Sequence, residues 1–333
     1  MADVELFEFS SSPHVRKPRT TRAIMVDVCI ALMPALIMGI VFFGWYAALL
    51  VTLAVASAVI SEFAYLLIMG KKFSQIVRGF DFSSCVTGLL IGLSIGTVYP
   101  WYAPVFGSAF AIIVVKMLFG GTGKNLVNPA ITGRILIFMS FQAMITGDWL
   151  LPSISSVMGR TVTTSPTTLE ALMKNVLPSL SNIDLLLGTG LAGCIGETCK
   201  IALILGAVYL GVRGVINVLY PIIYIALTGL MTVVIYGFDF AYFLPSILSG
   251  GLILGAIFMA TDYTTTPNTV KGNVIYFTSL GLLTAILRWA TKMEAVSFAI
   301  LLMNLIVPLI DKFILNKPFG YKKEKKTKEK VHG

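Results

Sequence analysis

We single out four of the charged side chains that fall within apolar stretches of the sequence, where an ionised group is costly. They are Glu62, Lys116, Glu197 and Lys200. An ionisable group at membrane depth needs a partner, water or a transported ion. Glu197 and Lys200 are three residues apart, which lets them pair on one helix face. We therefore take Glu62, Glu197 and Lys200 as candidates for an ion path; the alternative is that they lie near span ends and reach headgroup water.

Two polar connections of similar composition could hold a ligand. They cover residues 119–133 and 258–272, and each ends one apolar run and starts another. Gly-, Thr- and Asn-rich backbone at a helix start can leave amides free for a polar ligand, although the Walker spacing for nucleotide phosphates is absent. We expect a second flavin or an ion site there, the alternative being ordinary loops with helix caps. The candidate residues are Asn125, Asn128, Pro129, Thr261, Asp262 and Thr264.

Other reactive groups are few. Four cysteines could in number bind one iron–sulfur cluster, but their spacing is unlike a ferredoxin run. We interpret Cys29, Cys85, Cys194 and Cys199 as small buried residues. Both histidines lie in the tails, at His14 and His332, so they cannot build a haem or zinc site within the membrane, and no metal is expected.

The elements that must position these groups are transmembrane helices. Hydrophobic residues make up 56% of the 333 residues and charged residues only 12%, against about 25% charged in soluble domains. This excludes a soluble enzyme, a disulfide-stapled secreted module and a nucleic-acid binder. The sequence predicts an all-α integral membrane protein with ten spans, near 24–43, 46–69, 83–99, 102–119, 133–147, 188–212, 215–236, 244–260, 274–290 and 296–315.

The distribution of basic residues predicts the orientation of these spans. Most of the 25 Lys and Arg residues fall in the two tails and in alternate loops, as expected if both termini are cytoplasmic. The chain then divides into a tail at 1–22, a five-helix half at 23–147, an outer loop at 148–187, a second half at 188–315 and a basic tail at 316–333. The last of these is suited to anionic lipid headgroups.

The two halves contain a weak internal sequence repeat. Thr87-Gly88-Leu89 recurs as Thr228-Gly229-Leu230, and Pro104 recurs as Pro245 at the same offset. Many membrane carriers are such duplications, with their sites at the repeat interface. The span count makes the halves parallel, whereas one re-entrant segment, for which Gly188–Gly196 is the candidate, would invert them.

Several motifs together resemble the NqrB/RnfD family of membrane subunits, whose RnfD branch belongs to the Rnf ion-translocating ferredoxin:NAD⁺ oxidoreductase complex. They are Ser-Ser-Pro-His-Val at 11–15, Gly-Gly-x-Gly-x-Asn-x-x-Asn-Pro-Ala at 120–130, Gly-Glu-Thr at 196–198 and Ala-Thr-Asp at 260–262. The short N-terminus favours the Rnf branch. The resemblance implies a multi-pass subunit of the bacterial inner membrane that takes part in electron transfer between ferredoxin and NAD⁺, coupled to translocation of Na⁺ or H⁺.

The resemblance also implies cofactors and partners. Family members carry FMN on a phosphoester to a Thr in the outer loop. The matching stretch here is 162–169, where Thr167 is favoured and Thr168 and Thr164 are alternatives. A flavin transferase would attach this FMN, and a riboflavin bound between spans is a second expected cofactor. The other Rnf subunits, A, B, C, E and G, would supply the NAD and ferredoxin sites. Without the resemblance, a stand-alone channel or secondary transporter, or a passive scaffold, would suit the same sequence.

Overall fold

The computed structural model describes residues 19–141, 168–173, 181–189 and 193–314, and every regular element in these ranges is a helix. The prediction of an all-α membrane protein is therefore confirmed. Thr164 and Thr167 lie outside the described residues, as do residues 1–18, the basic tail at 316–333 and most of the predicted outer loop.

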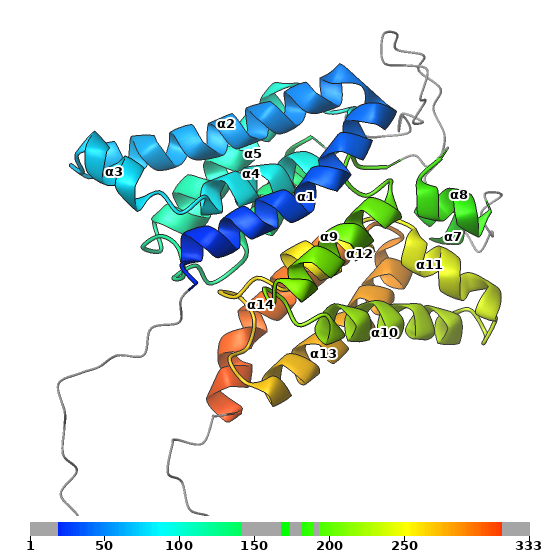
Figure 1. Cartoon of the computed structure of the whole chain (residues 1–333). Helices are drawn as coiled ribbons and strands as arrows, with labels where there is room; N and C mark the ends of the chain where they lie inside the picture. The colour runs from blue at the N-terminus through cyan, green and yellow to red at the C-terminus, as the bar shows by residue number, and fades with distance from the viewer. Residues whose placement is uncertain (1–18, 142–167, 174–180, 190–192, 315–333) are drawn as a thin grey trace, which may run out of the picture.

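The helices form two groups that lie against each other (Figure 1). The first group is α1 (Thr21–Phe43), α2 (Trp45–Ile68), α3 (Phe73–Gly79), α4 (Ser83–Leu93), α5 (Tyr102–Phe110), the π-helix η1 (Ala111–Met117) and α6 (Pro129–Ser140). Two short helices follow, α7 (Thr168–Met173) and α8 (Asn182–Leu187). The second group is α9 (Lys200–Val212), α10 (Leu219–Ile235), the 3₁₀-helix η4 (Phe240–Tyr242), α11 (Phe243–Leu248), α12 (Leu252–Leu254), the π-helix η5 (Gly255–Met259), α13 (Val270–Thr291) and α14 (Val296–Phe313).

The described helices differ in how far they could reach across a bilayer. By length and composition, α1, α2, α13 and α14 could each cross it. Two further spans are possible if bent pairs count as one each, α3 with α4 at 70° and η4–α11 with α12–η5 at 66°. The remaining apolar helices have 10–17 residues and are Tyr102–Met117, Pro129–Ser140, Lys200–Val212 and Leu219–Ile235. Each of the ten expected spans thus overlaps a helical segment, but length and composition support four to six full crossings.

Two expected spans are helical over only part of their length. The span expected at 83–99 ends as a helix at Leu93, and the span expected at 188–212 becomes helical only at Lys200. The non-helical stretches meet each other: the Ile195 amide donates to the Ile95 carbonyl at 3.0 Å, and the Gly196 amide to the Leu93 carbonyl at 2.7 Å. Irregular backbone is tolerated at membrane depth where protein buries it and satisfies its polar groups. The two non-helical stretches do this for each other.

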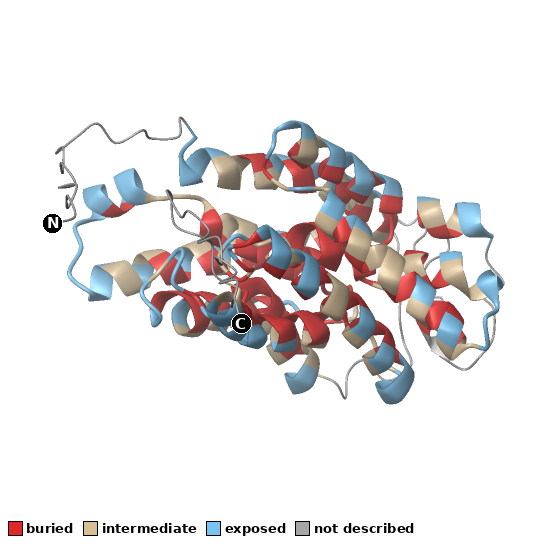
Figure 2. Ribbon diagram, turned by 90° about the horizontal axis from the view of Figure 1, so that it is seen from below, coloured by how far each residue is buried: buried red, intermediate tan, exposed pale blue. Residues whose placement is uncertain are grey.

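The distribution of side chains is that of a protein in lipid. Large apolar residues face outward on several helices, for example Ile37, Ile60, Leu205 and Leu309, each more than half exposed. Many polar and charged side chains are buried instead, and buried residues of all kinds gather in the middle of the molecule (Figure 2). Apolar surface outside and ionisable groups inside is the arrangement expected when the surrounding solvent is hydrocarbon.

Helix packing holds the elements together, and helix caps set where several of them begin. Helix α9 lies along α1, and α14 along α6, where the Phe138 and Phe298 rings meet edge to face. The side chains of Thr20, Asn128 and Thr269 accept a hydrogen bond from the first turn of α1, α6 and α13 respectively. Such caps satisfy orphan amide groups and set where each helix begins.

Candidate functional site

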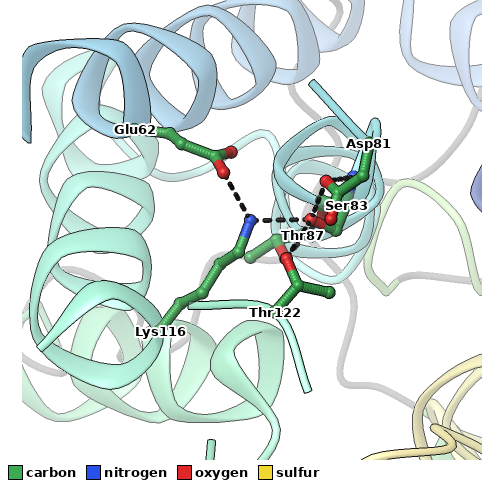
Figure 3. Close-up of polar contacts among 6 residues, drawn as sticks. All are labelled: Glu62, Asp81, Ser83, Thr87, Lys116 and Thr122. Carbon is green, nitrogen blue, oxygen red and sulfur yellow. Dashed lines mark hydrogen bonds and ion pairs between the residues drawn. The ribbon is translucent and has the colours of Figure 1, made fainter. Parts of the chain in front are cut away.

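Lys116 lies between Glu62 and Ser83 in the first group of helices (Figure 3). Its Nζ is 2.9 Å from Glu62 Oε1 and 2.6 Å from Ser83 Oγ. The three residues come from η1, α2 and the first turn of α4, and the Lys116 and Glu62 side chains are 3% and 10% exposed. The partner that Glu62 requires at this depth is therefore Lys116.

A hydroxyl network continues from this ion pair to the break before α4. Ser83 Oγ also donates to Asp81 Oδ1 at 2.5 Å and lies 3.2 Å from Thr122 Oγ1, while Thr87 Oγ1 donates to the Ser83 carbonyl (Figure 3). Phe82 takes the left-handed conformation, with φ 64°, which turns the chain from Asp81 into α4. The bend thus places one more carboxylate beside the Lys116 cluster.

Glu62 has a carboxylate oxygen that no described residue satisfies. Its Oε2 is buried without a hydrogen-bond partner, whereas Oε1 accepts from Lys116. Glu62 and Asp81 together carry two formal negative charges against one positive charge on Lys116. The cluster is therefore one cation short of neutrality, and an unmade interaction on a buried carboxylate is costly.

The two polar connections meet directly. The Asn128 side-chain amide donates to the Met259 carbonyl at 3.0 Å, and that of Asn125 donates to Thr264 Oγ1 at 3.1 Å. Thr264 Oγ1 in turn donates to Asp262 Oδ2 at 2.8 Å. Each connection follows a π-helix and precedes a capped α-helix. The repeated sequence pattern thus corresponds to a repeated local structure, and its two copies lie in contact.

Together they line a recess of about 760 Å³, a volume that includes the open space at its mouth. All six residues that the sequence marked for this site contribute to the lining, and Ser83, Thr87, Lys116 and Thr122 add further polar groups. The rest of the lining is largely apolar and includes Ile24, Val86, Leu210 and Phe258, from α1, α4, α9 and η5.

Glu197 and Lys200 do not pair through their side chains, contrary to the expectation from their spacing. Glu197 precedes α9 in non-helical backbone, so the two residues do not share a helix face. Lys200 Nζ donates to the Glu197 backbone carbonyl, and Glu197 Oε1 accepts from the Cys194 amide at 2.9 Å. Glu197 Oε2 has no partner among the described residues.

A second buried cluster surrounds Glu197. Arg134 of α6 forms an ion pair of 2.6 Å with Glu294, and Glu294 also accepts from the Gly251 amide at 2.7 Å. Ligand-type atoms of Cys194, Glu197 and Glu294 lie within 4.8 Å of one another. Arg134 contacts both the Glu294 carboxylate and, at 3.8 Å, Cys194 Sγ, so the positive charge of this cluster is already supplied by a side chain.

Of the three hydroxyls proposed for flavin attachment, only Thr168 is described. It begins α7 and is 8% exposed. Attachment by a separate enzyme requires a reachable hydroxyl, and that of Thr168 is buried.

Sequence reasoning missed Arg134 and the role of Lys116 as the Glu62 partner. Arg134 is the second residue of the span expected at 133–147, where a charge would reach water, whereas α6 begins at Pro129 and buries it. Lys116 stood out as an intramembrane charge, but nothing in the residue pattern indicates the π-helix that carries it.

The fold and the buried groups define a class: polytopic helical membrane proteins that keep ionisable residues and a polar recess between two groups of helices, as carriers of ions or redox cofactors do. Comparison with known proteins gives the family. The chain belongs to the NQR2, RnfD, RnfE family, whose model matches residues 8–320.

Curated relatives match nearly the whole chain. The D subunit of the Na(+)-translocating ferredoxin:NAD(+) oxidoreductase complex of Acetobacterium woodii is 38% identical over 95% of this chain and 96% of the relative. The D subunit of the proton-translocating ferredoxin:NAD(+) oxidoreductase complex of Clostridium ljungdahlii is 35% identical over the same shares. The D subunit of the ion-translocating oxidoreductase complex of Marinobacter nauticus is 30% identical, again over 95% and 96%.

Proposed function

We propose that the chain is the flavin-carrying RnfD membrane subunit of an Rnf-type complex, which transfers electrons between ferredoxin and NAD⁺ and couples this transfer to translocation of Na⁺ or H⁺. The observation that carries the proposal is the similarity to three such subunits over about 95% of the chain. The other Rnf subunits supply the NAD and ferredoxin sites. Both termini face the cytoplasm of the bacterial cell, and the 148–187 loop faces outward.

The recess between the two connections is the proposed place for a non-covalent riboflavin. A flavin ring has a polar edge that donates and accepts hydrogen bonds, and an apolar edge. The lining of the recess combines amide and hydroxyl groups, including Asn125, Thr122 and Thr264, with aliphatic and aromatic side chains. The residues present therefore fit such a ring. When bound, the flavin would supply one- or two-electron chemistry, while the protein groups bind it and exclude water.

A covalent FMN on the outer loop is the second proposed cofactor. Thr167 is the proposed attachment residue, with Thr168 and Thr164 as alternatives, and a flavin transferase forms the phosphoester. The burial of Thr168 argues against that alternative. A tethered flavin remains at the outer face, where it can exchange electrons with a neighbouring subunit.

Glu62 and Glu197 are the proposed ion-path residues, with Lys200 beside the latter. Each carboxylate is buried and keeps one oxygen without a partner among the described residues. Such an oxygen is suited to bind a proton or a sodium ion. The names of the Acetobacterium woodii and Clostridium ljungdahlii relatives specify different ions, so similarity does not select between them.

A denaturing gel tests the flavin role. The chain, co-expressed with the flavin transferase, is run unfolded and viewed under ultraviolet light beside Thr167→Val, Thr168→Val and Thr164→Val. We expect yellow-green fluorescence in the wild type and its loss only in Thr167→Val. A dark wild-type band would exclude covalent FMN, and fluorescence that survives Thr167→Val would move the attachment to another residue.

A further inference from the structure

We propose that Lys116 is shared between Glu62 and the ligand in the recess, so that negative charge in the recess raises the affinity of Glu62 for a monovalent cation. The inference rests on the proposed flavin in the recess and adds a link between that site and the carboxylate. Lys116 is then a positioning residue, and Glu62 and the ligand in the recess compete for its positive charge.

The geometry places Lys116 in both sites at once. Its side chain lines the recess beside Ser83, Thr122 and Asn125, while its Nζ is 2.9 Å from Glu62 Oε1. An ammonium group has three donors. Glu62 and Ser83 accept two of them, and the described residues offer the third no acceptor. An acceptor on the ligand edge can therefore bind Lys116 without first breaking the ion pair.

The charges around Glu62 explain why its ion pair with Lys116 would respond to negative charge in the recess. The groups that face it from neighbouring elements are Lys116 on η1, Asp81 at the start of α4 and the Cys85 thiol on α4. Lys116 is thus the single cation in this described cluster, and Asp81 already reaches it through Ser83. A further negative charge in the recess draws Lys116 away from Glu62, whose Oε2 is already unpartnered. The buried carboxylate then needs a replacement cation, because an uncompensated charge at this depth is strongly unfavourable.

The link is reciprocal by thermodynamic necessity. If a ligand charge in the recess strengthens cation binding at Glu62, a cation at Glu62 strengthens the binding of the charged ligand by the same factor. Affinity for an anionic ligand, relative to a neutral one, must therefore increase with the concentration of the cation. This is a binding property that can be measured without turnover.

The experiment uses the full chain in detergent, expressed without the flavin transferase so that covalent FMN does not contribute. Riboflavin is titrated by fluorescence quenching, and the reduction potential of the bound riboflavin is read by absorbance at several Na⁺ concentrations and at several pH values. Dithionite, oxidised to sulfite, supplies two electrons; with one proton from water, these leave one negative charge in the recess. The variants are Lys116→Met, Lys116→Arg, Glu62→Gln and the double variant Lys116→Met/Glu62→Gln. Asp27→Asn is the control, because Asp27 is a buried carboxylate that pairs with Arg213 and does not line the recess.

In the wild type and in Asp27→Asn, we expect the potential to rise with the concentration of one cation. A response to Na⁺ identifies a sodium site, and a pH slope steeper than that of Glu62→Gln identifies a proton site. In Glu62→Gln, the reduction potential no longer shows this dependence on the cation. At low cation concentration it is more positive than in the wild type, since the charge of Lys116 then acts on the recess alone. Lys116→Met weakens riboflavin binding at least tenfold, and Lys116→Arg retains most of it. The double variant, which removes both charges together, keeps the measurement interpretable if Lys116→Met alone fails to fold.

Two failures are distinguishable. No riboflavin binding by the wild type overturns the proposed recess site, and this inference with it. Riboflavin binding with the same affinity and the same cation dependence in wild type, Lys116→Met/Glu62→Gln and Glu62→Gln overturns the inference alone.

Discussion

The Asn128 side-chain amide, at the start of α6, donates a 3.0 Å hydrogen bond to the Met259 carbonyl at the end of η5. The same side chain accepts from the Ala130 amide and so caps α6. One residue therefore begins a helix in the first group and closes the C-terminal end of a π-helix in the second. The lining of the recess depends on both roles, and substitution can separate the helix cap from the hydrogen bond to Met259.

Asn128→Ala removes both functions, whereas Asn128→Ser retains a hydroxyl that can cap α6 but cannot reach Met259. Loss of a cap costs about 1 kcal/mol, and loss of a buried hydrogen bond about another 1 kcal/mol. We therefore expect Asn128→Ala to lower the unfolding temperature in detergent about twice as much as Asn128→Ser. Equal effects of the two variants would show that the bond across the groups adds nothing.

Arg134→Met leaves the Glu294 carboxylate without its ion-pair partner. Breaking a buried pair from one side typically costs about 3–5 kcal/mol, whereas removing both charges together is often nearly neutral. We expect Arg134→Met to be strongly destabilised and Arg134→Met/Glu294→Gln to recover most of the loss, as measured by thermal unfolding. If the double variant is no more stable than the single one, Arg134 acts through packing and not through its charge.

Gly88 allows α4 to lie directly on α2. A Cβ at this position would lie 2.6 Å from Val55 Cα and 2.9 Å from the Ala54 carbonyl oxygen, both backbone atoms that cannot turn away. Gly88→Ala should cost about 1–3 kcal/mol by overpacking and disturb the Glu62–Lys116 pair. The matched control is Gly79→Ala, because a Cβ at Gly79 meets nothing within 4 Å. A stable Gly88→Ala protein would mean that the two helices can separate.

Orientation can be tested by labelling introduced cysteines with a membrane-impermeant maleimide. Lys124 and Thr291 are both exposed, in the recess connection and at the end of α13 respectively. The prediction of cytoplasmic termini places Lys124 inside and Thr291 outside. Thr291→Cys should therefore react in intact cells, and Lys124→Cys only after permeabilisation, each compared with the unsubstituted chain as background. The reverse pattern would invert the topology.

Hydropathy located the long helices and the polar groups but could not locate the breaks. The apolar runs at 24–43 and 46–69 coincide with α1 and α2, because in lipid the composition of a span follows from its surroundings. Residues 94–99 belong to the apolar run expected at 83–99 but are not helical. Hydropathy reports side chains, whereas unwinding depends on backbone partners, here Ile195 and Gly196, which lie about a hundred residues further along the chain.

Backbone breaks also decide which neighbouring site residues can be predicted from the sequence and which cannot. Asn125 and Thr264 were grouped because the two connections repeat each other, and the structure brings them to 3.1 Å. Glu197 and Lys200 were paired on the assumption of a continuous helix, which does not exist before Lys200. Spacing arguments thus hold only within an unbroken element.

The paired unwound segments also bear on when such a chain becomes stable. Each group of helices contributes one irregular stretch, and the amides of Ile195 and Gly196 satisfy carbonyls of Ile95 and Leu93 in the other group. Alone, the first group would leave these carbonyls unsatisfied in hydrocarbon and the second would leave the two amides unsatisfied, at several kcal/mol for each group. Such a chain therefore becomes stable only once both groups of helices are present and in contact, because neither group satisfies its own unwound backbone.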